Sequence, residues 1–117
     1  MSGMEPYWEL LDEYVVCDYR SFRLLDAPEV DFGREAVIDM NRRYWGAFAE
    51  YSVKAEEYVD LGESVLVVMR EQGRGKGSGV PFDREMAWIW TFRKGRIVRM
   101  EPFRTREQAL EAAGLSE

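Results

Sequence analysis

The chain has 117 residues, 46% of them hydrophobic, which is enough for a single domain with a buried core. Its formal net charge of -6 disfavours a nucleic-acid-binding or anionic-membrane surface, because both need clustered lysine and arginine. The chain has no histidine and a single cysteine, Cys17, so the sequence predicts no metal site and no internal disulfide.

The same features give expectations about partners and location. We expect no cofactor, no nucleic-acid partner and no membrane partner. No apolar run approaches the roughly 18 residues of a membrane-spanning helix, and the first residues lack the basic and apolar blocks of a signal peptide. A single unpaired thiol is typical of a reducing compartment, so the predicted location is the cytoplasm.

The pattern of apolar residues predicts helices at both ends of a run of strands. In chain order we expect a short helix over residues 4–12, a strand over 14–19, a long helix over 33–50, strands over 52–60, 63–71, 81–92 and 96–103, and a terminal helix over 106–113. The long helix is the strongest of these predictions, because apolar residues recur in it at helical spacing. Phe32 is expected to pack on Val37 as a hydrophobic staple at its start.

The later elements are marked by their turns and caps. Both faces of the strand over 63–71 are apolar, so it should lie in the centre of a sheet. The glycine-rich residues 73–79 lead towards another strand rather than a helix, which favours a hairpin loop over a phosphate-binding loop. Gly95 should form the turn of a hairpin, and Thr105 with Gln108 is a capping box. Together these elements predict an α+β fold with helices packed on one face of a curved antiparallel sheet.

Four segments carry a resemblance to a known family. They are residues 32–37 (FGREAV), 73–79 (GRGKGSG), 90–99 (WTFRKGRIVR) and 107–115 (EQALEAAGL). With them the chain, from about residue 9 onward, resembles the SnoaL-like branch of the nuclear transport factor 2-like superfamily. The resemblance implies a cone-shaped, cystatin-like sheet with helices over its concave mouth, an apolar pocket inside and a homodimer. Members include polyketide cyclases, ketosteroid isomerases, epoxide hydrolases and many proteins with no known reaction.

The chain departs from this family at its beginning, where the superfamily has a longer helical region. Only about a dozen residues precede the first predicted strand. We therefore expect residues 1–117 to form a single domain with a shortened N-terminal helix, or else the start is placed late. A shortened helix would leave the cone more open.

Asp18 is the candidate base, since comparison with the ketosteroid isomerases places it near the end of the first strand, where their carboxylate base lies. At an apolar cone mouth its pKa would be raised, which suits a base. The competing interpretation is an ordinary hydrogen-bonded aspartate at a strand end. Arg104 is the candidate for polarising a ligand oxygen. The competing interpretation is an ordinary surface arginine just before a helix.

The known reactions of the superfamily are not reproduced residue by residue. Ala87 occupies the place where the isomerases carry an acid, eight residues before the hairpin glycine, and no tyrosine lies at the right distance before Asp18. An oxyanion hole without donors gives little rate enhancement, so steroid isomerisation is disfavoured. The later strands also supply no second aspartate after Asp83 for the Asp-Arg-Asp relay of the epoxide hydrolases.

Alternation along the hairpin strands divides their residues between two faces, provided that no bulge intervenes. The predicted pocket lining is Tyr14, Val37, Tyr44, Tyr58, Ala87, Ile89, Val98, Met100 and Pro102. Trp88 and Trp90 then fall on the opposite, convex face, where an exposed tryptophan stripe would suit a dimer partner. The reverse assignment would make both tryptophans plain core.

Two functions follow from these observations. The first is binding of a small apolar organic molecule in the cone, with cofactor-independent proton transfer or cyclisation on a carbonyl compound as the reaction if the protein is an enzyme. The second is a non-catalytic, dimeric interaction protein that uses the convex sheet face. The sequence decides neither for nor against catalysis, and it names no substrate.

Overall fold

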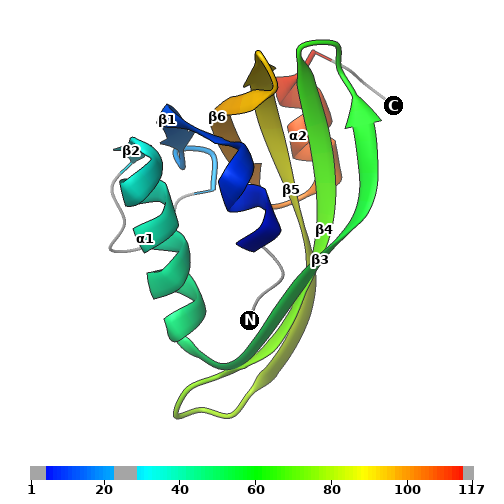
Figure 1. Cartoon of the computed structure of the whole chain (residues 1–117). Coiled ribbons are helices and arrows are strands. Elements are labelled where there is room, and N and C mark those ends of the chain that lie inside the picture. Colours follow the sequence, from blue (N-terminus) through cyan, green and yellow to red (C-terminus); the bar gives the residue numbers. More distant parts are fainter. Residues whose placement is uncertain (1–4, 23–28, 115–117) are drawn as a thin grey trace.

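The computed structural model describes residues 5–22 and 29–114 of the chain. Figure 1 shows that helices stand on both sides of a strongly curved sheet. In chain order the elements are the 3-10 helix η1 (Glu5–Leu10), β1 (Leu11–Asp18), β2 (Val30–Phe32), α1 (Arg34–Gly46), β3 (Phe48–Asp60), β4 (Ser64–Gly75), β5 (Pro81–Arg93), β6 (Arg96–Phe103) and α2 (Arg106–Ala112). Among these described residues, no helix is both long and apolar enough to cross a lipid bilayer.

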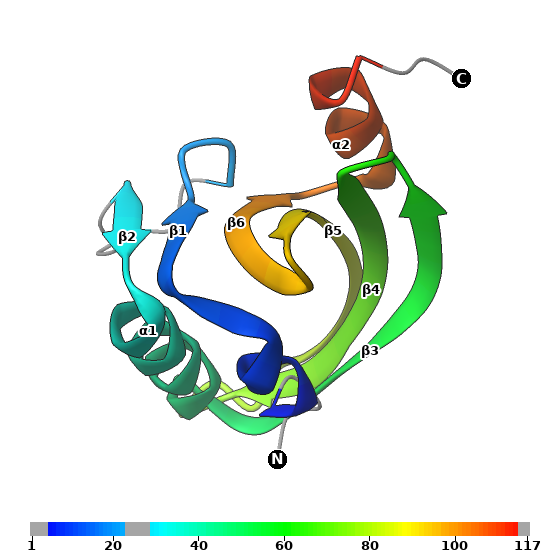
Figure 2. The same ribbon diagram turned by 45° about the horizontal axis from the view of Figure 1, so that its top comes forward.

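The six strands form one sheet in the order β2-β1-β6-β5-β4-β3. All neighbouring strands run antiparallel except β1 and β6, which run parallel. The sheet is strongly curved, and α1 and η1 lie on its concave side, as Figure 2 shows. The predicted α+β fold with a curved, cone-like sheet is therefore confirmed, although one pair of its strands is parallel.

The curved sheet carries a hydrophobic core on each face. The larger core lies on the concave face beneath α1 and η1 and includes buried side chains from β1, β4, β5 and β6. The smaller core lies on the convex face beneath α2, and its buried members are Leu66, Val68, Ala87, Ile89, Phe103, Ala109 and Leu110. The prediction that helices cover the concave face therefore holds for α1, whereas α2 packs on the opposite face.

Helix α1 begins after Gly33, whose φ of 94° lies in the left-handed region that favours glycine. It ends at Gly46, whereas the sequence predicted a helix to residue 50, and residues 48–50 belong to β3 instead. The predicted staple is wrong: Phe32 pairs with Val16 across β1 and β2 and is 73% exposed. Strand alternation turns Phe32 to the convex face, away from Val37, which is buried in the concave core.

A bulge in the β5–β6 hairpin changes which residues of the two strands share a face. The turn at Lys94 and Gly95 has positive φ at both positions, as predicted for a tight hairpin. The register then shifts between Thr91 and Phe92, so that Thr91 pairs with Arg99 and one extra residue stands in β6. A single extra residue in one strand changes the pairing beyond it, so that Trp88 and Trp90 share a face with Pro102 and Met100.

Both tryptophans lie on the concave face of the sheet, opposite to the face predicted for them. Trp88 pairs with Pro102 and Trp90 with Met100, and both tryptophans are buried in the concave core. The prediction of an exposed dimer face on Trp88 and Trp90 is therefore wrong. The prediction that Ala87 and Ile89 line the cavity is wrong for the same reason, since both lie in the convex core beneath α2.

Candidate ligand pocket on the concave face

Two small hollows lie side by side between α1 and the concave face of the sheet, each with a volume of about 30 Å³. They share four lining residues: Asn41, Tyr44, Met86 and Trp88. The first hollow is completed by Tyr19, Phe22, Met40 and Pro102, and the second by Trp45, Tyr51, Val53, Met69 and Glu71. The lining is mostly aromatic and aliphatic with a few polar groups, which is the usual composition of a small-molecule pocket.

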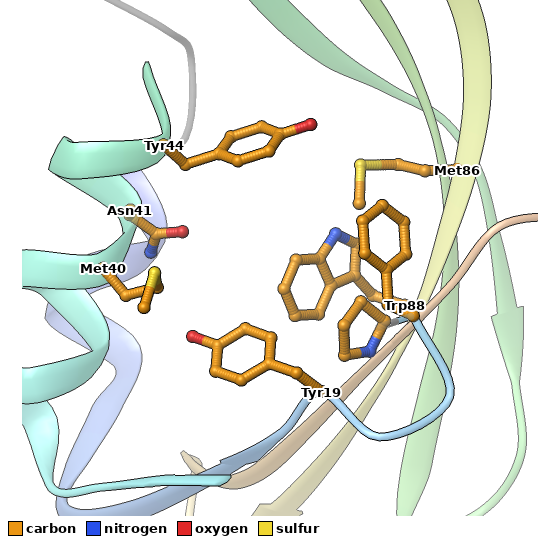
Figure 3. A pocket seen from close by; sticks show the side chains of 8 residues that line it. Tyr19, Met40, Asn41, Tyr44, Met86 and Trp88 are labelled. Atoms are coloured by element: carbon orange, nitrogen blue, oxygen red, sulfur yellow. The ribbon is translucent and has the colours of Figure 1, made fainter. Parts of the chain in front are cut away.

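The shared residues come from two elements that face each other. Asn41 and Tyr44 are three residues apart on α1, so they project from the same side of the helix. Met86 and Trp88 alternate on β5 and both point to the concave face. Figure 3 shows Tyr44 reaching across the hollow from α1 towards Met86, with Tyr19 on the opposite wall.

A buried carboxylate borders the second hollow. The side chain of Glu71 on β4 is fully buried. Arg84 on the neighbouring strand donates from Nε to Glu71 Oε1 at 2.9 Å. The Tyr44 hydroxyl donates to Oε2 at 3.1 Å, and the Tyr51 hydroxyl donates to the same oxygen. Arg84 also donates from Nη2 to the Tyr44 hydroxyl at 2.9 Å, which closes a network of four side chains.

The tyrosines of this network are held in their neutral form. Burial, together with the adjacent Glu71 carboxylate, raises the pKa of Tyr44 to about 12. Burial and the same carboxylate also raise the pKa of Tyr51. Both hydroxyls therefore keep their protons around neutral pH and can act as donors. The network presents neutral hydroxyl groups to the hollow, while the charges of Glu71 and Arg84 offset each other.

An open groove of about 290 Å³ lies beside the second hollow. Its lining consists of Glu50, Tyr51, Ser52, Gln72, Gly73 and Phe82. Tyr51 therefore lines both spaces. Its ring is part of an aromatic cluster in which Phe48 stacks on Tyr51 at 5.3 Å and contacts Phe82 at 4.9 Å between ring centroids. The Tyr51 ring therefore forms a wall shared by the second hollow and the open groove.

The structure places Asp18, the predicted base, away from both hollows. Val15 and Cys17 on β1 belong to the concave core, so the alternation of the strand turns Asp18 to the convex face. There the Asp18 residue is 4% exposed, and its carboxylate accepts from Arg20 at 2.6 Å and from Arg99 at 2.7 Å. Hydrogen bonds from Arg20, aided by Arg99, hold the pKa of Asp18 well below its usual range. The expectation of a raised pKa is wrong, because the site is an ion cluster and not an apolar mouth.

Arg104 is not among the residues that line the hollows. It donates from Nη2 to the backbone oxygen of Phe22 at 2.8 Å, and its guanidinium lies 4.6 Å from the centre of the Phe22 ring. Phe22 itself lines the first hollow. Arg104 therefore supports one wall of the hollow through Phe22, and its contacts within the described part of the chain do not place its guanidinium in the lining.

The remaining predicted pocket residues are divided. Tyr44 and Pro102 line the hollows, and Val37 and Met100 are buried in the concave core around them. Tyr14 is 78% exposed on the convex side of β1, and Val98 is the extra residue of the bulge. Tyr58 is exposed, and its hydroxyl lies 2.9 Å from that of Tyr7 in η1, so it borders η1 and not the hollows.

The sequence analysis missed the residues that form the polar end of the pocket. These are Asn41, Tyr51, Glu71 and Arg84. Glu71 had a recognisable signal: it continues the alternation of Val67 and Met69 on β4, which places a carboxylate on an otherwise apolar face. A charge at such a position needs a partner, and Arg84 stands directly opposite in the register.

Comparison with known proteins identifies the family. The profile of the SnoaL-like domain matches residues 7–100, which is most of the chain. No curated protein matches. Solved structures match over nearly the whole chain at low sequence identity, so these matches show only that the fold is shared.

One such structure is a hypothetical protein with a ketosteroid isomerase-like fold from Catenulispora acidiphila, in complex with trimethylamine. It is 19% identical, with a TM-score of 0.72, and the match covers 97% of this chain and 85% of that one. TerC co-crystallised with polyporic acid is 14% identical, with a TM-score of 0.73 and coverage of 95% and 85%. A protein from Jannaschia that is described as a SnoaL-like polyketide cyclase is 21% identical, with a TM-score of 0.70, and the match covers 93% of this chain and 76% of that one. The chain belongs to the SnoaL-like domain family.

Proposed function

We propose that this protein binds a small, largely apolar organic molecule in the paired hollows beneath α1. The observation that carries the proposal is the pocket itself: an apolar lining from α1 and β5, with hydroxyl and amide groups from Tyr44 and Asn41. Apolar walls supply affinity and a few polar groups fix the orientation of the ligand. The proteins of this fold that were crystallised with trimethylamine and with polyporic acid give support by analogy.

The hollows are small, so a ligand fits only if nearby side chains move. Each holds about 30 Å³, which is room for little more than one or two waters before side chains move. Met40 and Met86 line the first hollow, and unbranched thioether side chains adapt readily to a new neighbour. A compound with one ring, seated between Trp88 and α1 after these methionines shift, is therefore the ligand class that we propose.

The proposal concerns binding, and it does not use Asp18 as a base. The Asp18 carboxylate faces the convex side and is bound by Arg20 and Arg99. The alternative function, association through an exposed tryptophan stripe, loses its basis because Trp88 and Trp90 are buried. The expected homodimer itself stays a prediction.

Tryptophan fluorescence gives a direct test. Single-ring phenols, ketones and quinones would be titrated into the protein while its emission and its melting temperature are followed. A compound at a hundredfold its dissociation constant adds about 2.7 kcal/mol, which corresponds to a shift of several degrees for a domain of this size. We expect a saturable change in emission together with a raised melting temperature.

Two tryptophan variants locate the binding site. Trp88 lines both hollows, whereas Trp90 lies on the same face of β5 without lining either. Because Trp45 also lines the second hollow, Trp88→Phe should lose part of the ligand-induced change in emission, whereas Trp90→Phe should keep all of it. A panel that produces no saturable change in the wild-type protein would overturn the proposal, as would an unchanged response in Trp88→Phe.

A further inference from the structure

The hydrogen bonds of Tyr44 leave its hydroxyl with one free position. A tyrosine hydroxyl offers one donor and two acceptor lone pairs. Its proton is directed to Glu71 Oε2 at 3.1 Å, and one lone pair accepts from Arg84 Nη2 at 2.9 Å. The second lone pair is what remains for a ligand in the hollows that Tyr44 lines. This hydroxyl therefore offers a ligand an acceptor and no donor.

The direction of the bond from Tyr44 to Glu71 follows from the other partners of the carboxylate. Tyr51 and Arg84 both donate to Glu71, the second with a charged N–H. Such convergence of donors on one buried side chain is typical of an ionised carboxylate, which accepts hydrogen bonds and donates none. Glu71 and Arg84 thus fix the rotation of the Tyr44 O–H bond. They act on a ligand through Tyr44, as positioning residues.

The other polar groups that line both hollows include donors. The Asn41 side chain carries an amide NH2 group. The Trp88 indole carries one N–H, and Figure 3 shows its nitrogen on the side of the ring towards Tyr44 and Met86. A ligand oxygen that both donates and accepts can use these groups together, giving its proton to Tyr44 and accepting from Asn41 or Trp88.

We infer, building on the proposed function, that the pocket selects ligands with a neutral hydroxyl, such as a phenol or an enol, over the matching ether or anion. An ether oxygen has no proton to donate, so one of its lone pairs would face the free lone pair of Tyr44. The Tyr44 oxygen would then stay without a partner at that position. A phenolate does the same and also brings a negative charge close to Glu71, whose carboxylate is fully buried. The protonation state of the ligand hydroxyl thereby decides its affinity.

Two matched probes test this inference: 4-nitrophenol, and 4-nitroanisole, in which a methyl group replaces the hydroxyl proton. Dissociation constants would be measured by tryptophan quenching and calorimetry, below and above the pH at which the phenol ionises. We expect the neutral phenol to bind at least about tenfold more tightly than the anisole, since an unmet buried polar group costs about that much. Raising the pH should weaken the binding of the phenol and leave that of the anisole unchanged.

Variants assign the discrimination to Tyr44 and its positioning residues. Tyr44→Phe removes the acceptor, so the phenol and the anisole should then bind within about threefold of each other. Glu71→Gln lets the amide donate to Tyr44 and frees the tyrosine proton for the ligand, which should also abolish the preference. If Glu71→Gln does not fold, Tyr44→Phe decides alone. Tyr58→Phe is the matched control, since it removes a tyrosine hydroxyl bonded to Tyr7 outside the hollows, and it should keep the full preference.

The possible outcomes separate this inference from the proposed function. Binding of both probes with equal affinity to the wild-type protein overturns the donor requirement and leaves the pocket standing. A preference that survives in Tyr44→Phe overturns the assignment to Tyr44. Binding of neither probe overturns the proposed single-ring pocket and this inference with it.

Discussion

Glu71 and Arg84 stand directly opposite each other in the register of β4 and β5, and their side chains form an ion pair of unequal exposure. The carboxylate is 0% exposed, whereas the Arg84 side chain is 47% exposed. The Glu71 carboxylate therefore depends on Arg84 for compensation of its charge, whereas the Arg84 guanidinium can also be hydrated by solvent. This inequality gives the two residues different importance for stability.

Removing the cation should cost more than removing the anion. Arg84→Met leaves a buried carboxylate with only the two tyrosine hydroxyls, and we expect a loss of about 3 kcal/mol in the free energy of unfolding. Glu71→Gln keeps the shape and lets the half-exposed guanidinium turn to water, so about 1 kcal/mol is expected. Urea denaturation monitored by circular dichroism would measure both. A larger loss in Glu71→Gln than in Arg84→Met would contradict the argument.

Asp18 should contribute stability that depends on pH. Its pKa is lowered in the folded protein, so its contribution is fully present above the usual aspartate pKa of about 4 and is lost as the pH falls towards the folded value. Asp18→Asn should cost about 2 kcal/mol at pH 7. The difference from wild type should shrink progressively below about pH 4.

The matched control for Asp18 is Asp39, whose ion pair with Arg43 is exposed on both sides. Asp39→Asn should change the free energy of unfolding by less than about 0.5 kcal/mol both at pH 7 and below about pH 4, because exposed ion pairs contribute little. Equal effects of the two substitutions at pH 7 would show that the convex cluster around Asp18 adds no stability beyond that of a surface pair.

Gly73 is required by the close approach of β3 to β4. A Cβ atom at this position would lie 2.2 Å from the backbone oxygen of Glu50 and 2.9 Å from the Phe82 ring. Because one of these contacts is backbone, Gly73→Ala should destabilise the fold by at least about 2 kcal/mol. It should also distort the open groove that Gly73 lines.

Gly46, at the end of α1, is the control for Gly73. A Cβ there would meet nothing within 4 Å, and Gly46 is not among the glycines with positive φ. Gly46→Ala should therefore leave stability unchanged or raise it by up to about 1 kcal/mol, since alanine is the better helix former. Thermal unfolding of both variants checks the contrast.

The cap of α2 should contribute measurably to the convex core. The Thr105 side chain accepts from the backbone N–H of Gln108 at 3.1 Å. Thr105→Ala should cost about 1 kcal/mol and speed amide hydrogen exchange in α2. Ser78→Ala is a suitable comparison, because the Ser78 hydroxyl accepts one bond of 3.3 Å in an exposed turn. No difference between these two variants would show that the cap is dispensable.

Local signals in the sequence predicted the local structure well. The strand over 96–103 has the predicted bounds, and Thr105 caps α2 as the capping box implied. The reciprocal bond of that box differs in one detail, since the Gln108 side chain accepts from the backbone of Arg104 rather than from that of Thr105. These features depend on residues a few positions apart, which is the range over which a single sequence is informative.

Most of the failures concern pairing over longer distances, although two local predictions, the end of α1 and the Phe32 staple at its start, also failed. The bulge near Val98 changes which residues of β5 and β6 share a face, and nothing in the sequence marks the bulge. The raised pKa predicted for Asp18 failed because the alternation of β1 turns its carboxylate to the convex face, where the neighbouring Arg20 and the distant Arg99 bind it. The polar end of the pocket depends on α1, β3, β4 and β5 meeting at Glu71, and a sequence pattern shows each strand but not their register.

The parallel pairing of β1 with β6 determines when the protein can finish folding. Among the described strands β1 is synthesised before the other five and β6 after them, so Cys17 cannot pair with Met100 until the strands between them have been made. The β3–β4–β5 meander can form earlier, because its neighbours follow one another along the chain. Until then, the apolar concave residues of β1 have no β6 to pack beside. The apolar face of β1 therefore stays uncovered by β6 while the strands between them are synthesised, and exposed apolar surface of this kind favours aggregation.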